Sequence, residues 1–166
     1  MESNATPVEE IKEVNPEIRA AKEFPVSVNW VQRNQFIATD DKSHAIVIDN
    51  DKQGGGDETG MTPMRLLLAA VASCTSIDVV DILKKSRQDL THLTVSARGV
   101  KNESYPRYYK EIHLLYKLRG KNLDKSRVER AIRLSEDKYC SVGATVNGKA
   151  KISIQYYIEE EGEDKM

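Results

Sequence analysis

The sequence predicts an α+β fold with the element order β-β-β-α-β-β-α-β. Three observations support this prediction: alternating apolar and polar residues between positions 25 and 49, a long apolar helix after Thr62, and a second group of alternating segments that contains an amphipathic helix. Strand groups interrupted by two helices are typical of α+β folds and not of doubly wound parallel sheets. A chain of 166 residues is long enough to build one domain with its own core.

The domain is expected to span residues 24–160. Residues 1–23 are charged and contain two prolines, which predicts a flexible arm. Residues 161–166 are expected to fray, because a short polar terminus has little to hold it.

The first group of strands is expected to form an antiparallel meander. Residues 25–32, 35–40 and 44–49 alternate in polarity and are separated by short polar turns. Residues 50–60 follow, with three consecutive glycines and several acids. No GK[ST] motif follows them, so the sequence predicts a mobile connection and not a phosphate-binding loop.

The clearest helix covers residues 62–88. Thr62 can act as its N-cap, and Pro63 suits the first helical position. Residues 66–72 are apolar on every face, which is typical of a helix that is buried on all sides. The chain has few other helices to surround this one, so the sequence predicts a homodimer built around it.

The second half of the chain is expected to add three strands and a helix. The strands cover residues 90–100, 108–118 and 150–160, and the helix covers 123–140 with Asp124 as its N-cap. Apolar or small residues at 128, 131, 132, 135 and 139 form one stripe of this helix. Tyrosines such as Tyr116 are expected to pack between strands. Asp78 and Asp81 are expected to cap polar contacts inside a dimer core and not to act as an acid–base pair.

Composition and charge exclude several classes of protein. The 25 basic and 26 acidic residues give a net charge of -1, whereas dedicated nucleic-acid binders normally carry a basic excess. The longest apolar stretch is broken from Ser73 onward, and the first residues lack the pattern of a secretory signal. We therefore expect no membrane span and a cytoplasmic location.

Cys74 and Cys140 are the two cysteines, too few for a disulfide scaffold. There is no CxxC motif and no histidine spacing typical of zinc sites, so no metal or cofactor is expected. Either cysteine alone is most often a small buried apolar residue. A reactive thiolate needs a positive neighbour, for which Arg33 and Arg65 are the candidates; Asp78, one helical turn after Cys74, would oppose it.

Two segments of the chain resemble one known family. GMTPMRLLLAAVASCTSIDVVDILKK, with its TP dipeptide and ASC element, and RAIRLSEDKYCSVGATV, with YCSV after a helix, are similar to the OsmC/Ohr family of osmotically inducible and organic hydroperoxide resistance proteins. The resemblance covers about residues 24–158 and is stronger to the OsmC-like branch. It implies an intertwined homodimer with Cys74 as the peroxidatic cysteine, Cys140 as the resolving cysteine, and Arg33 as the residue that favours the thiolate.

One position departs from the family pattern. Ohr-type members carry a glutamate just after the proline that opens the helix, where it orients the arginine, whereas this chain has Met64. Either Asp57 or Glu58 takes its place, or the arginine is held in another way, or the peroxidase activity is weak.

The resemblance implies a thiol-dependent peroxidase for organic hydroperoxides that a thiol or dithiol reductant recycles. The alternative is a non-catalytic dimer that keeps the fold to bind a small molecule. A third hypothesis is a redox sensor whose Cys74–Cys140 disulfide alters its contacts with a partner.

Overall fold

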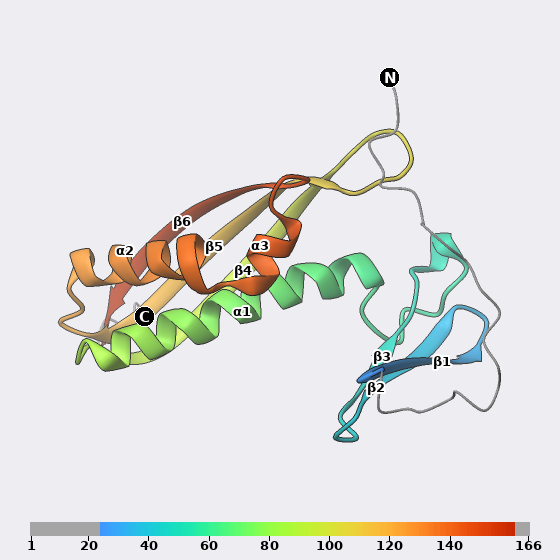
Figure 1. Ribbon diagram of the computed structural model, residues 1–166, viewed down its shortest axis with the longest axis horizontal. Helices are drawn as coiled ribbons and strands as arrows, with labels where there is room; N and C mark the ends of the chain where they lie inside the picture. The colour runs from blue at the N-terminus through green and yellow to red at the C-terminus, as the bar shows by residue number, and fades with distance from the viewer. Residues whose placement is uncertain (1–23, 162–166) are drawn as a thin grey trace, which may run out of the picture. The chain divides into compact units, whose positions relative to one another are not determined.

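The computed structural model describes residues 24–161 (Figure 1). These residues form two compact units, and the division between them along the chain falls between Thr62 and Pro63. Each unit is described by itself. The predicted arm, residues 1–23, and nearly all of the predicted tail lie outside the described residues. The strands and helices follow the predicted order β-β-β-α-β-β-α-β, so the α+β fold is confirmed, with two short helical turns added before the last strand.

The first unit holds a three-stranded antiparallel sheet. Its strands β1 (Val26–Gln32), β2 (Gln35–Asp40) and β3 (Ala45–Ile48) pair in chain order, which confirms the predicted meander. All seven residues of β1 are exposed. Among the described residues of this unit, Ala38 is the one buried apolar side chain, so the sheet has little core of its own.

The glycine-rich segment after β3 is more ordered than predicted. It contains a short 3₁₀ helix, η2 (Lys52–Gly54), and wraps around the buried carboxylate of Asp49. Asp49 accepts hydrogen bonds from the backbone N–H groups of Asn50 at 2.7 Å, Asp57 at 3.1 Å and Thr59 at 3.0 Å, and from the Thr59 hydroxyl at 2.7 Å. These bonds, led by those from Thr59, lower the pKa of Asp49 to about 2. The prediction of a mobile connection was wrong, because three backbone N–H groups and one hydroxyl group of the segment bond to this carboxylate.

The second unit places two helices along one face of a three-stranded sheet (Figure 1). The sheet consists of β4 (Asp89–Lys101), β5 (Tyr109–Lys121) and β6 (Lys151–Glu160); β5 pairs antiparallel with β4 and parallel with β6. The helices are α1 (Pro63–Lys85) and α2 (Lys125–Leu134).

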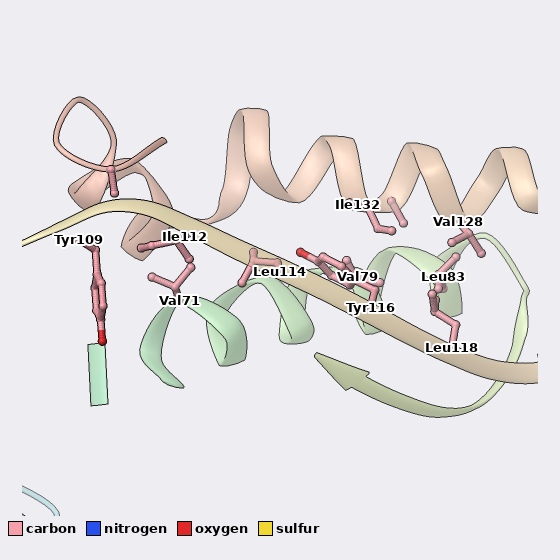
Figure 2. Packing of buried hydrophobic residues seen from close by; sticks show 12 residues of the cluster. Val71, Val79, Leu83, Tyr109, Ile112, Leu114, Tyr116, Leu118, Val128 and Ile132 are labelled. Atoms are coloured by element: carbon pink, nitrogen blue, oxygen red, sulfur yellow. The ribbon is translucent and has the colours of Figure 1, made fainter. Parts of the chain in front are cut away.

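The core of the second unit lies between these helices and the middle strand. Alternate side chains of β5 point toward the helices and are fully buried, from Ile112 to Leu118 (Figure 2). Leu83 of α1 and Val128 of α2 meet them with no exposed surface. The alternation that predicted the strand therefore marks its core-facing residues.

The helix predicted over residues 123–140 is divided in three. Asp124 caps α2 as predicted and accepts bonds from two backbone N–H groups, but α2 ends at Leu134. A π-helical turn, η3 (Ser135–Tyr139), follows, and a short helix, α3 (Ser141–Val146), begins after Cys140. Ser135 is fully buried and hydrogen-bonded to α1, and the wider turn accommodates this side chain.

Helix α1 is buried on one face within the chain and not on all sides. Val71, Thr75, Val79 and Leu83 face the core of the second unit, whereas Ile77 is 64% exposed. By length and composition alone α1 could cross a membrane, but its apolar face belongs to the core described above, as expected of a core helix.

Candidate active site

The structure brings the two cysteines together from distant parts of the chain. Cys74 lies in the middle of α1 and is partly exposed, while Cys140 lies between η3 and α3 and is 2% exposed. Both are free thiols, and the side chain of Cys74 interacts with that of Cys140. One accessible sulfur thus lies beside one enclosed sulfur.

Cys140 caps helix α3 with its own sulfur. The backbone N–H of Gly143 donates a hydrogen bond to Cys140 Sγ at 3.2 Å. A Cβ atom at position 143 would lie 3.1 Å from that sulfur, so glycine permits the close approach. Burial nevertheless dominates and raises the pKa of Cys140 to about 12, with smaller contributions from Cys74 and from the charge of Glu136. At neutral pH Cys140 is therefore a neutral thiol.

A cluster of buried hydroxyl groups lies next to the cysteines. Thr75 Oγ1 is 2.6 Å from Tyr116 Oη and 2.8 Å from Ser135 Oγ. Ser135 donates to Asp78 Oδ2 at 2.9 Å, and Tyr116 donates to Glu136 Oε1 at 3.2 Å. The cluster joins α1, which carries Cys74, to β5 and to η3, which directly precedes Cys140.

Sequence analysis found only part of this cluster. Tyr116 packs against the core, as expected. Asp78 holds a polar contact within the second unit, whereas Asp81 is exposed in the single chain, and their place in a dimer core stays a prediction. The hydrogen bonds of Tyr116 and the roles of Thr75 and Glu136 were missed. The sequence did carry a sign of the cluster, because each helix has a polar residue within its apolar stripe. In the first helix this is Thr75, between Val71 and Val79, and in the second it is Ser135.

Burial also sets the protonation of this cluster. It raises the pKa of Glu136, and the nearby charges of Asp137 and Asp78 add to the effect. It raises the pKa of Tyr116 as well, so the phenol remains a hydrogen-bond donor throughout the physiological range. The site thus holds a carboxyl group whose pKa is raised near a thiol whose pKa is raised as well.

Arg33 lies in the first unit, in the two-residue turn between β1 and β2. Its φ angle is +48°, a left-handed conformation that non-glycine residues adopt rarely, and its carbonyl accepts a 2.8 Å bond from Trp30 Nε1. Arg33 Nη1 lies 2.8 Å from Asp57 Oδ1. Asp57, and not Glu58, thus pairs with the arginine. The effect of Arg33 on Cys74, a residue of the second unit, stays a prediction.

Metal ligands are not grouped in the part of the chain that the structure describes. Between residues 24 and 161 no three histidine, cysteine, aspartate or glutamate side chains are arranged to hold an ion.

The sequence profile of the OsmC-like protein family matches residues 54–155, which include both cysteines and the whole hydroxyl cluster. The chain belongs to the OsmC family. This confirms the resemblance found in the sequence. The protein YhfA of Escherichia coli K12 is 33% identical over 131 residues, which cover 79% of this chain and 95% of YhfA.

Several solved structures share the fold of this chain. A hypothetical protein from Aquifex aeolicus VF5 has a TM-score of 0.72 and 30% identity, and the match covers 82% of this chain and 96% of that one. An organic hydroperoxide resistance protein from Elizabethkingia anophelis has a TM-score of 0.64 and 13% identity, with 81% and 94% covered. At that identity the second match shows the fold of the OsmC family and nothing finer.

Proposed function

We propose that this OsmC family member is a thiol-dependent peroxidase that reduces organic hydroperoxides. The observation that carries the proposal is the interaction of the partly exposed Cys74 side chain with the buried thiol of Cys140. Structural neighbours named as organic hydroperoxide resistance proteins support the class of substrate. Exposed apolar surface near Cys74 on α1, provided by Ile77, favours an alkyl peroxide over a small polar one.

The chemistry needs both sulfurs. The Cys74 thiolate attacks one oxygen of the peroxide, the O–O bond breaks, and the alkoxide takes a proton and leaves as an alcohol. Cys74 is then a sulfenic acid. The sulfur of Cys140 attacks it, a disulfide forms, and the hydroxide leaves as water. An external thiol or dithiol, in the cytoplasm, reduces the disulfide; Arg33, paired with Asp57, is proposed to favour the Cys74 thiolate.

The test counts thiols and measures intact mass. Reduced wild-type protein is mixed with cumene hydroperoxide, and in parallel with hydrogen peroxide. We expect the loss of both thiols and of about 2 Da per chain, faster with cumene hydroperoxide, because disulfide formation removes two hydrogen atoms. If both thiols persist at excess peroxide, the peroxidase proposal is wrong.

A second candidate function is a non-catalytic binder or redox sensor. It is favoured by Met64, which stands where Ohr-type members carry the glutamate, and by the burial of Cys140. For a binder, the same experiment leaves both thiols unreactive, and a small molecule is released on denaturation. For a sensor, the disulfide forms but is not turned over by a thiol or dithiol reductant.

The peroxidase is proposed to act as a homodimer that covers α1. Ile77 is a large apolar side chain in the middle of this helix, and it is 64% exposed within the single chain. Replacing Ile77 with glutamate is expected to shift the protein from dimer to monomer, because a charge would be buried in the interface. Sedimentation velocity measures the change.

Leu115→Glu is the matched control for the dimer. Leu115 lies on β5 with its side chain away from the core and is 40% exposed. This variant should sediment as the wild type does. A monomeric wild type, or an Ile77→Glu protein that stays dimeric, would contradict the proposed assembly.

A further inference from the structure

Three hydroxyl groups connect two carboxyl groups through the core of the second unit. The order is Glu136, Tyr116, Thr75, Ser135 and Asp78, with successive oxygen–oxygen distances of 3.2, 2.6, 2.8 and 2.9 Å. Thr75 and Ser135 have no exposed surface, and neither does Tyr116. The chain of hydrogen bonds is therefore continuous and shielded from water along its middle.

The number of protons in this row of hydrogen bonds allows it to carry a proton. It has four links, and its three hydroxyl groups supply three protons. When both carboxyl groups are ionised, one link lacks a proton. With one additional proton, every hydrogen bond in the row has its proton. The additional proton can lie on either carboxyl group. When each of the three hydroxyl groups passes its proton to the next oxygen, the carboxyl proton moves from Glu136 to Asp78. The geometry thus suits the transfer of one proton between the two carboxyl groups.

The two ends of the chain lie near the two cysteines. A Cβ atom built on Gly143 would lie 3.1 Å from Cys140 Sγ and 3.9 Å from Glu136 Oε2, so the thiol and the carboxylate border the same small space. Asp78 follows Cys74 by four residues on α1, which places both on one face of the helix, one turn apart.

We propose that these five residues form a proton path that serves disulfide formation. Glu136 accepts the proton of the Cys140 thiol as its sulfur attacks the Cys74 sulfenic acid. Tyr116, Thr75 and Ser135 each pass a proton on, and Asp78 donates one to the hydroxide that leaves Cys74. One thiol proton is released, one water is formed, and the S–S bond replaces an S–H and an S–O bond. The inference rests on the proposed peroxidase function.

Two further features support the path. Burial and the nearby carboxylates raise the pKa of Glu136, so that it binds a proton more readily than an exposed glutamate. Glu136 also lines a cavity of about 350 Å³ between α2 and β6, together with Ile132 and Tyr156. Water in this cavity can exchange a proton with Glu136, so this end of the path is open to solvent, whereas its middle is not.

The test separates the two chemical steps. Reduced protein is mixed with one equivalent of cumene hydroperoxide and quenched at intervals with a reagent that traps sulfenic acid. Its intact mass is then measured by mass spectrometry. For Glu136→Gln we expect sulfenic acid to form at the wild-type rate and the disulfide to form about 100-fold more slowly, as for the loss of a general base. Thr75→Val should slow the disulfide step by about tenfold or more, and Thr75→Ser, which restores the hydroxyl, should return it to within about twofold of wild type.

Asp81→Asn is the matched control, since it removes an exposed carboxylate of α1 that lies outside the path. It should leave both steps unchanged. Disulfide formation at the wild-type rate in Glu136→Gln overturns the inference, and so does a Thr75→Val protein in which both steps slow equally. If the wild type forms no sulfenic acid at all, the proposed function fails, and this inference fails with it.

Discussion

The Cys74→Ser variant is expected to consume organic hydroperoxide no faster than buffer. Serine keeps the size of the side chain, but its hydroxyl does not ionise near neutral pH and cannot replace the thiolate as nucleophile. Cys140 does not take over, because it is 2% exposed and its pKa is raised to about 12. The measurement is peroxide consumption by the fully reduced variant, followed by thiol titration, which should still find one thiol per chain.

Cys140→Ser provides the contrast. Here the peroxidatic sulfur remains, so one equivalent of peroxide should be consumed and Cys74 should stop at the sulfenic acid, about 16 Da heavier. Turnover with a dithiol should fall but not vanish, since the reductant can attack the sulfenic acid directly. If Cys140→Ser is inert and Cys74→Ser active, the two roles are reversed.

Replacing Leu83 with alanine is expected to have the largest effect on stability. Leu83 has no exposed surface and contacts the core between α1, α2 and β5, where Figure 2 shows it beside Val128 and Leu118. Removing its branched side chain loses transfer free energy and leaves a cavity, so the free energy of unfolding should fall by about 2–5 kcal/mol. Urea unfolding, measured at one protein concentration because of the proposed dimer, gives this value.

The control for Leu83 is Leu115→Ala on the outward side of β5. Its side chain is 40% exposed, so the same truncation should cost well under 1 kcal/mol, on the order of a surface substitution. Equal costs for the two variants would mean that the described core does not carry the stability of the second unit.

Features that depend on neighbouring residues were predictable from the sequence, and those that depend on distant partners were not. Alternation marked the strands, and Thr62 with Pro63 marked the start of α1. The resemblance singled out Cys74 and Cys140. The end of α2 at Leu134 was missed, because the π-helical turn accompanies hydrogen bonds from Ser135 to α1, a partner about 60 residues away by sequence number.

The segment around Asp49 and the hydroxyl cluster escaped prediction for a related reason. The spacing of apolar residues in the sequence shows where a polar residue lies on the buried face of a helix. It does not show which hydroxyl or N–H group that residue bonds to. Glycines and acids in residues 50–60 suggested a loose connection, whereas the collected donors around Asp49 give it order. The sequence left open whether Asp57, Glu58 or another group holds Arg33, and the structure pairs it with Asp57.

The parallel pairing of β5 with β6 has a consequence for biosynthesis. A parallel pair requires the chain to return along the whole sheet, and α2, η3 and α3 form this return path with Cys140 inside it. The crossover is closed only by β6, whose Ile152 and Ile154 pack against the core. On the ribosome β6 emerges after both cysteines, so the sheet of the second unit is completed only once Cys74 and Cys140 have both been synthesised.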